Sequence, residues 1–456
     1  MPGVAEEPKS LAEPPAYSLL RAEENYNYLR NRSASPYTED YFDPLKHIRL
    51  GKNSEAYVSF GGEFRPRYAY FENRLWENER DVDFYSQRIS AHANWHLKDS
   101  VRLFTELYHG YTSHEKEIAE YDELDWHQAF FEYKTTSGEG RRLSLRFGRQ
   151  EMGFGAARVV GLREGPNIRR SFDAVRTIYS VDKNWVQAFF GREVFPRSYV
   201  FDNDFEFFDD EAANPYLWGM YSQFSIKGDV GPTELYYLGF KSDLARFNDV
   251  SGKEKRHSIG VRRFGRIGKS WVYNSELIYQ FGDIGGADIS AFNIETDWRF
   301  EFVDTAWRPG LGIKLEYTTG DDETGDGEIN SFNPMFVNPE YYSLAKTVTP
   351  VNMISVHPSI VLYPREGLTV YLEWAAFWRE SKNDGLYAPP RFLRRDGAGI
   401  NSRKIGNQIG IRLKYAFNRH VTFDLDVSYF SAEAFLEDSG ESDNILHIAP
   451  TISCKF

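Results

Sequence analysis

The sequence predicts an all-β fold: a transmembrane antiparallel β-barrel of about 18 strands over residues 57–456, preceded by a non-barrel N-terminal extension over residues 1–56. Three observations predict it. Aromatic residues make up 16% of the 456 residues, apolar and polar residues alternate along most of the chain, and short and long connections alternate between the resulting segments. No uninterrupted apolar run reaches the roughly 18 residues that a membrane-spanning helix needs, which excludes a helical membrane protein.

Residues 1–56 differ from the rest because they do not alternate. They contain several prolines and a tyrosine-rich stretch over residues 17–41, and this aromatic content argues against a disordered segment. We expect an extension at the periplasmic mouth of the barrel. Residues 1–5 carry neither the basic nor the apolar region of a signal peptide, which favours a processed or recombinant start.

The alternation is clear in residues 88–97. Every second side chain from Ile89 to Leu97 is apolar and those between are polar, which is the period of a strand with two different faces. The pattern recurs over residues 292–302, 311–317, 368–378 and 405–415. Most of these segments are about 10 residues or longer, as tilted membrane strands are. We therefore expect the apolar face to contact lipid and the polar face to line a wet lumen.

The connections favour a bacterial outer-membrane barrel, in which short turns lie on the periplasmic side and long loops lie outside. Tight turns are expected at residues 98–100, 182–184, 228–231, 364–367 and 417–419. Long polar loops are expected over residues 71–83, 112–123, 151–171, 194–215, 242–255, 320–352, 380–402 and 431–443. A barrel of about 18 strands leaves an aqueous channel, so we expect a pore. A soluble β-sandwich or propeller is the alternative, which the charged row Glu295, Asp297 and Arg299 disfavours.

The last predicted strand alternates up to the C-terminal residue, Phe456. A terminal aromatic residue of this kind resembles the signal that the outer-membrane assembly machinery recognises. We therefore expect that machinery, outer-membrane lipid and lipopolysaccharide as partners. Cys454, the only cysteine, falls on the lipid-facing side, and a single cysteine excludes an intrachain disulfide and a cysteine-based zinc site.

Several function classes are disfavoured by composition and motifs. A net charge of −13 argues against nucleic-acid binding. No Gly-x-Ser-x-Gly elbow occurs, and no nucleophile and base can be paired, so we expect neither an enzyme nor a cofactor. The acidic loop with Asp321, Asp322 and Asp326 is a weak calcium candidate, because its spacing does not fit the EF-hand pattern; no other metal site is predicted.

Arginines are the best candidates for a functional site. Alternation places a first group on the lumen side: Arg65, Arg67, Arg88, Arg102, Arg146, Arg176, Arg379 and Arg412. The glycine-rich loop 151–171 adds Arg158, Arg163, Arg169 and Arg170, and we expect it to fold into the pore and line a constriction. Guanidinium groups bind carboxylates in a planar, bidentate way, and several weak sites in a row let a polyanion move.

A second interpretation of these arginines is purely structural. Inward carboxylates lie on the same predicted strands, namely Glu63, Glu106, Glu132, Glu316 and Glu373. In this interpretation the arginines neutralise those carboxylates and attract no solute.

Two segments resemble the alginate export family of outer-membrane porins: Leu-Arg-Phe-Gly-Arg-Gln at residues 145–150 and Arg-Ser-Phe-Asp-Ala-Val-Arg at residues 170–176. Supporting stretches lie at residues 331–336, 357–387 and 405–410, and the similarity runs over residues 57–456. The resemblance implies an eighteen-stranded monomeric barrel that passes an anionic exopolysaccharide outward through an electropositive constriction. It also implies that Arg146 and Arg149 line the conduit, although alternation alone turns Arg149 outward.

The function predicted from the sequence is therefore a passive outer-membrane channel for an anionic polysaccharide, as in alginate export, with periplasmic export partners. A general or uptake porin for small anionic or neutral solutes is the first alternative. A barrel lipase or esterase and a plugged structural adhesin or assembly platform are the others.

Overall fold

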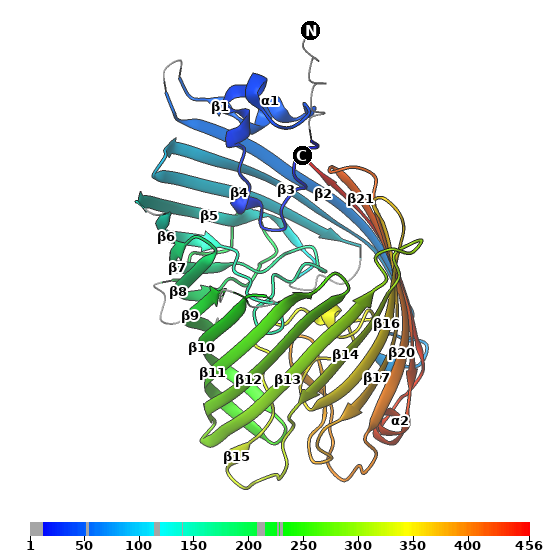
Figure 1. The fold of residues 1–456 in the computed structure, drawn as a ribbon. Coiled ribbons are helices and arrows are strands. Elements are labelled where there is room, and N and C mark those ends of the chain that lie inside the picture. Colours follow the sequence, from blue (N-terminus) through cyan, green and yellow to red (C-terminus); the bar gives the residue numbers. More distant parts are fainter. Residues whose placement is uncertain are drawn as a thin grey trace.

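The computed structural model describes residues 12–51, 54–113, 119–138, 140–207, 215–225, 228 and 231–456. Over these residues, eighteen antiparallel strands form a closed barrel (Figure 1). Each strand pairs with the next one along the wall, and the last strand pairs with the first, as in the register of Glu63 with Lys455 and Glu72 with Leu446. Closure leaves no free edge, which a spanning sheet in lipid requires.

The barrel strands are β2 (Tyr57–Glu72), β3 (Val82–Lys98), β4 (Val101–Thr112), β5 (Asp122–Ser137), β6 (Arg141–Gln150), β7 (Phe172–Val181), β8 (Asn184–Glu193), β9 (Tyr216–Phe224), β10 (Thr233–Phe247), β11 (Val250–Ile267), β12 (Trp271–Ile284), β13 (Ala287–Glu301), β14 (Gly310–Thr318), β16 (Met353–Arg365), β17 (Leu368–Arg379), β20 (Lys404–Ala416), β21 (Val421–Ala432) and β22 (Ile445–Lys455).

Several short strands and helices lie outside the set of eighteen barrel strands. β1 (Ile48–Arg49) pairs with β2, β15 (Glu328–Ile329) pairs in parallel with β13, and β18 (Leu386–Ala388) forms a hairpin with β19 (Phe392–Arg395). The helices are η1 (Arg21–Glu23), η2 (Asn27–Ala34), α1 (Asp43–Lys46), η3 (Arg74–Trp76), η4 (Pro339–Tyr341) and α2 (Ala434–Ser439). In the described part of the chain, no helix has the length and apolar character needed to cross a membrane.

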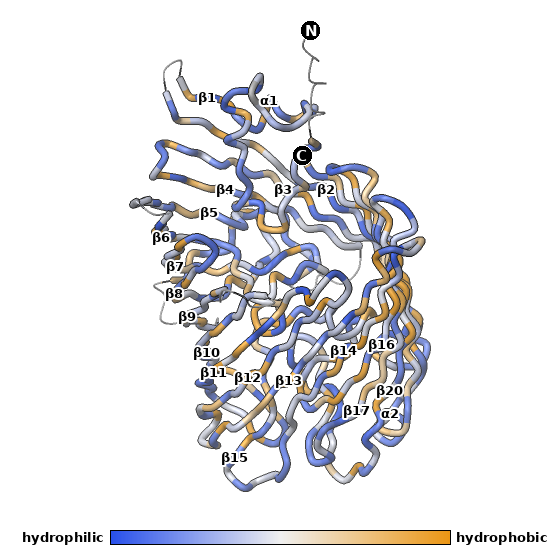
Figure 2. Tube along the Cα trace, in the orientation of Figure 1, coloured by the Kyte–Doolittle hydropathy of each residue, from blue (hydrophilic) through white to orange (hydrophobic). Residues whose placement is uncertain are grey.

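The two faces of the wall differ as the alternation predicted. Ile89, Leu311 and Ile409 are 43%, 50% and 61% exposed, whereas the neighbouring Arg88 and Gln408 are buried inside the barrel. Figure 2 shows hydrophobic and hydrophilic residues alternating along the strands. Such large apolar exposure around the whole wall is what a lipid-facing surface presents.

One predicted loop differs from the structure, and parts of three other predicted connections lie outside the described residues. The predicted loop 242–255 is instead the end of a long hairpin, because β10 and β11 stay paired up to Phe247 and Val250. Both faces of this hairpin carry charged residues, so the two-residue period that marks a membrane strand is lost although the strand continues. Parts of the predicted loops 112–123 and 194–215 and of the predicted turn 228–231 lie outside the described residues.

The extension lies at the end of the barrel that carries the short turns (Figure 1). Lys46 is its best-anchored residue: it is 1% exposed, and its Nζ donates to the carbonyl of Phe60 on β2 at 2.8 Å. The Lys46 ammonium also lies over the rings of Tyr17, Tyr26 and Phe456. Burial lowers the pKa of Lys46 to about 7.

A second anchor joins the extension to the turn between β20 and β21. The carboxylate of Asp40 lies 2.7 Å from His420 Nε2 and 3.6 Å from the guanidinium of Arg419. Tyr17 adds a ring contact with His420 at 5.4 Å between centroids. The extension therefore joins neighbouring parts of the rim on either side of β22.

Candidate solute pathway through the barrel

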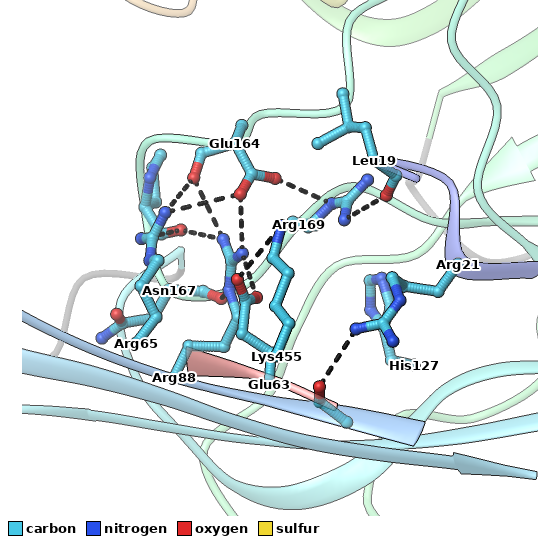
Figure 3. A network of polar contacts seen from close by, with 12 residues as sticks. Leu19, Arg21, Glu63, Arg65, Arg88, His127, Glu164, Asn167, Arg169 and Lys455 are labelled. Atoms are coloured by element: carbon cyan, nitrogen blue, oxygen red, sulfur yellow. Dashed lines mark hydrogen bonds and ion pairs between the residues drawn. The ribbon is translucent and has the colours of Figure 1, made fainter. Parts of the chain in front are cut away.

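The loop 151–171, between β6 and β7, crosses the inside of the barrel. At one end Arg158 binds the carboxylates of Glu276 on β12 and Glu295 on β13, at 2.8 and 3.0 Å. At the other end the loop contacts the wall at β2 and β3, as Figure 3 shows. A glycine- and arginine-rich loop thus spans between wall strands that face each other across the lumen.

The contacts with β2 and β3 are made mainly by the backbone of the loop. Arg65 and Arg67 each donate to the carbonyl of Gly165 at 2.6 Å, and Arg88 donates to the carbonyl of Asn167 at 2.7 Å. The carboxylate of Glu164 binds Arg88 at 2.9 Å, Arg169 at 3.1 Å and Arg65 at 3.6 Å (Figure 3). Burial raises the pKa of Glu164, but these cations outweigh burial and hold it well below the usual range.

A second loop, residues 319–352, also lies inside the barrel and meets the first. The amide of Gly161 donates to the carbonyl of Phe336 at 2.8 Å, and the amide of Phe336 donates to Val159 at 2.9 Å. Arg170 reinforces the junction by donating to the same Phe336 carbonyl at 2.7 Å and by pairing with Glu193 at 2.8 Å. The two loops therefore form one internal structure.

This internal structure is held by an apolar core on the wall strands β7–β13. Its buried members include Phe154 and Val160 from the first loop and Phe332, Met335 and Phe336 from the second. From the wall it includes Phe172, Ala174, Phe189, Leu217, Tyr221, Tyr236, Leu238, Phe240, Ile278 and Ala291. This part of the lumen is filled with protein, so the passage is narrower than the barrel itself.

Charged groups that water reaches lie on the inner wall and on the second loop. Arg412 on β20 binds Asp426 in a bidentate manner at 2.6 and 2.9 Å and remains 33% exposed. Glu340 pairs with Lys346 at 2.7 Å, and about a fifth of each side chain is exposed to solvent. A side chain at Gly165 would collide with both groups, so the first loop closely approaches this pair. Burial raises the pKa of Glu340, but Lys346 and Arg412 outweigh it and lower the pKa to about 2.

A second charged region lies nearer the short turns, on β4–β7. Arg102 on β4 and Arg146 on β6 both bind Glu132 on β5, the latter at 3.1 Å. Arg146 stands opposite Arg176 on β7 in the register, and Lys134 lies 3.2 Å from Glu132. One carboxylate comes from outside the barrel wall: Glu23 of the extension binds Arg146 at 2.7 Å.

Arg149 lies outside the lumen, although the family motif places it in the conduit. Arg149 is two residues after Phe147 on the same strand, so its side chain lies on the same outer face as that of Phe147, which is 43% exposed. The guanidinium of Arg149 binds the carboxylate of Asp173 at 2.8 Å. It donates to the carbonyls of Asn203 and Asp204 at 3.0 and 2.6 Å. These residues belong to the loop 194–207, which folds down over the outer face of the barrel, so Arg149 anchors that loop.

The remaining predicted residues hold backbone in place. Arg379 is fully buried and donates to the carbonyls of Asp384 at 2.9 Å and Ile400 at 2.7 Å, inside the loop between β17 and β20. Arg163 donates to the carbonyl of Ile168 within its own loop at 3.1 Å. Arg379 is therefore better described as a structural residue than as part of a conduit.

The calcium candidate is not assembled. Asp321 accepts hydrogen bonds from Asn248 at 2.8 Å and from the amide of Asn330 at 3.3 Å, and Asp326 accepts one from the amide of Glu328. Within the described ranges, no group of three or more His, Cys, Asp or Glu side chains is arranged to hold a metal ion.

Sequence reasoning missed the loop 319–352 and Glu23 as parts of the interior. The signal for the loop was present, since Phe332, Met335 and Phe336 are apolar residues in a connection expected to be polar. No comparable signal marks Glu23, whose partner is 123 residues away in the sequence.

An eighteen-stranded barrel with a lipid-facing exterior, a charged interior and inward-folded loops defines a bacterial outer-membrane channel of the porin type. The sequence also matches the family described as Alginate export over residues 56–445. The chain belongs to that family, and no curated protein matches it.

Solved structures share the fold at low sequence identity. The chain is similar to Pseudomonas aeruginosa OpdO, with a TM-score of 0.57 and 10% identity over 88% of this chain and 97% of that one. P. aeruginosa OccK2 (OpdF) in complex with glucuronate gives a TM-score of 0.55 and 12% identity, covering 88% and 98% of the two chains. Acinetobacter baumannii OccAB1 gives 0.55 and 12%, covering 88% and 97%.

Proposed function

We propose that the barrel is a passive conduit for an anionic polysaccharide whose sugars carry carboxylates, as in alginate export. The charged region on β4–β7 carries the proposal. Arg102, Arg146, Arg176 and Lys134 lie around the wall carboxylate Glu132, and Glu23 of the extension supplies a second carboxylate to Arg146. This patch has an excess of cations, and Arg146 already binds the carboxylate of Glu23, the same functional group that a uronate sugar carries.

The structural interpretation of the arginines explains only part of the set. Arg88, with Glu63 at 3.1 Å, and Arg158 are neutralised by wall carboxylates and hold the internal loops. Arg146 differs because one of its two partners, Glu23, is 44% exposed and is not part of the wall. Membership of the alginate export family supports a polyuronate as the cargo.

Uptake of small carboxylates is the second candidate. The internal loops narrow the passage, and a structurally similar barrel, OccK2, is known in complex with glucuronate, a single uronate sugar. A similar fold at 12% identity supports a similar pore shape but not the same ligand. The length of the solute that blocks the pore therefore distinguishes uptake of small carboxylates from polysaccharide export.

The orientation of the protein follows from the same proposal. Short turns of outer-membrane barrels face the periplasm, so we propose that the extension meets the periplasm at the short-turn end of the barrel of residues 57–456. Phe456 at the same end is then available to the assembly machinery in the periplasm before the barrel closes, and the rim offers a docking place for export partners.

The proposed function is tested by inserting the purified protein into a planar bilayer and measuring the reversal potential in a salt gradient. We expect anion selectivity, block by oligouronates that strengthens with chain length, and a loss of selectivity in Arg146→Glu by about tenfold in the permeability ratio, or ~1.4 kcal/mol. Block by glucuronate as strong as block by the oligomers would favour the uptake candidate. A pore without selectivity and without block would contradict both.

A further inference from the structure

Residues 17–26 of the extension enter the lumen and contact the closing seam of the barrel. Arg21 is 5% exposed; it donates to the carbonyl of Gly62 on β2 at 3.0 Å and to that of Phe456 at 2.8 Å. Figure 3 shows Arg21 and Leu19 beside the internal loop, where Arg169 donates to the Leu19 carbonyl at 2.9 Å. The segment thus runs from the rim to the loop that narrows the pore.

The contact of this segment with the charged region on β4–β7 is made by η1, Arg21–Glu23. The carbonyl of Ala22 accepts a hydrogen bond from Arg102, and the carboxylate of Glu23 accepts one from Arg146 at 2.7 Å. Burial raises the pKa of Glu23, but Arg146 and Arg102 outweigh it and hold it below the usual range. Glu23 is therefore charged at neutral pH, as the carboxylate of a uronate is.

Two carboxylates share Arg146, and they differ in how easily each is replaced. Glu132 is 1% exposed and fixed in the wall, whereas Glu23 is 44% exposed to the water of the lumen. An ion pair that water reaches is weakened by competing ions. A solute carboxylate that enters the lumen can therefore take the place of Glu23 without disturbing Glu132.

The apolar contact that accompanies η1 is small. Ala22 packs with Phe104 and Phe130, and the guanidinium of Arg146 lies 4.3 Å from the centre of the Phe130 ring. Hydrophobic stabilisation scales with the area buried, so a contact centred on one alanine holds the segment weakly. Hydrogen bonds and ion pairs provide most of its attachment inside the lumen.

We propose that residues 17–26 are a displaceable plug at the short-turn end of the channel, and that Glu23 occupies the place on Arg146 that a carboxylate of the solute takes during passage. The assignment of Glu23 to the place of a solute carboxylate rests on the proposed function. The assignment of residues 17–26 as a plug requires only that this segment narrows the pore.

The plug is tested by single-channel recording of the full chain in planar bilayers, comparing wild type with Glu23→Gln. Losing one charge-assisted hydrogen bond should raise the ratio of open to closed time by about tenfold. Glu55→Gln is the matched control, because Glu55 pairs with Arg30 on the exposed outside of the extension and should leave that ratio unchanged. The heat-modified mobility of each variant on a gel verifies that the barrel has folded.

A tethered variant provides an independent measurement. Ala22→Cys with Phe104→Cys, in a Cys454→Ser background, joined by a short reducible crosslinker, should abolish the opening events, and reduction should restore them. Equal recordings for wild type, Glu23→Gln and the tethered protein would overturn the plug.

Competition with the solute separates this inference from the proposed function. If Glu23 occupies the carboxylate site, the oligouronate concentration that gives half block should fall about tenfold in Glu23→Gln relative to wild type. Unchanged block with unchanged opening would overturn the inference and leave the uronate conduit intact. More opening without any uronate effect would support the plug and contradict the uronate conduit.

Discussion

The two internal structures of the barrel are held in different ways. The loops 151–171 and 319–352 are fixed by a large apolar core and by buried ion pairs such as Arg158 with Glu276 and Glu295. Residues 17–26 of the extension are held in the lumen by hydrogen bonds, by the partly exposed ion pair of Glu23 with Arg146 and by a small apolar contact at Ala22. The difference supports the proposed plug: the loops are anchored by a large core, whereas the extension is held in the lumen mainly by polar contacts.

The largest effect is expected from removing the apolar anchor of the loops. Phe336 is 1% exposed and packs against Phe172 and Phe240, with ring centroids 5.2 and 5.7 Å apart. Phe336→Ala should lower the free energy of unfolding by about 3 to 5 kcal/mol and raise the conductance. Phe392→Ala, at a residue that is 68% exposed, should change stability by less than about 0.5 kcal/mol. If urea unfolding separates the two variants by less than 1 kcal/mol, the loops are not anchored by this core.

The two arginines of the family motif should respond differently. Arg149→Gln removes the guanidinium that pairs with the buried carboxylate of Asp173, which keeps only weaker partners such as the Glu206 amide. It should lower stability by about 3 kcal/mol, with no change in ion selectivity. Arg146→Gln should reduce anion selectivity, with a smaller loss of stability of about 1 kcal/mol, because the buried Glu132 keeps Arg102 and Lys134 as partners. Urea unfolding and reversal potentials of both variants check this. A selectivity change in Arg149→Gln would place that residue in the conduit after all.

The smallest effect is the pH dependence of the extension. The pKa of Asp40 is lowered, because hydrogen bonds from the Phe42 amide and His420 outweigh burial, and that of Glu23 is lowered as well. A carboxyl with a lower pKa in the folded state stabilises that state above its unfolded pKa, and the contribution disappears as the pH falls through the folded value. Docking should therefore be constant from pH 6 to 5 and weaken below about pH 4, by on the order of 1 kcal/mol.

A dye on Glu39→Cys in a Cys454→Ser background reports this release as a fall in fluorescence anisotropy. Lys46, with a pKa of about 7, stays mostly charged over this range. Glu23→Gln with Asp40→Asn removes both titrating groups and should give a flat profile. A profile for this double variant that matches wild type would assign the pH dependence to other groups.

The sequence was sufficient to predict the wall but not its contents. Lipid selects every second side chain, so Ile89 and Ile409 identified their strands and faces without any structural information. Outside the lipid that selection ends, and the hairpin around Phe247 and Val250 was therefore taken for a loop. The pairing of Glu23 with Arg146 joins residues far apart in the chain, and no local pattern encodes it. For Arg149, the alternation of the strand predicted the outward position of the side chain correctly, whereas the family motif predicted a position in the conduit.

The bonds of Arg21 have a consequence for the order of events in biogenesis. Its guanidinium joins a carbonyl near the start of the first strand to the carbonyl of the last residue in the chain. Both acceptors exist side by side only after β2 and β22 have paired. The bonds of Arg21 can therefore form only on a closed barrel, so in a chain that has not yet closed Arg21 does not cover the terminal Phe456.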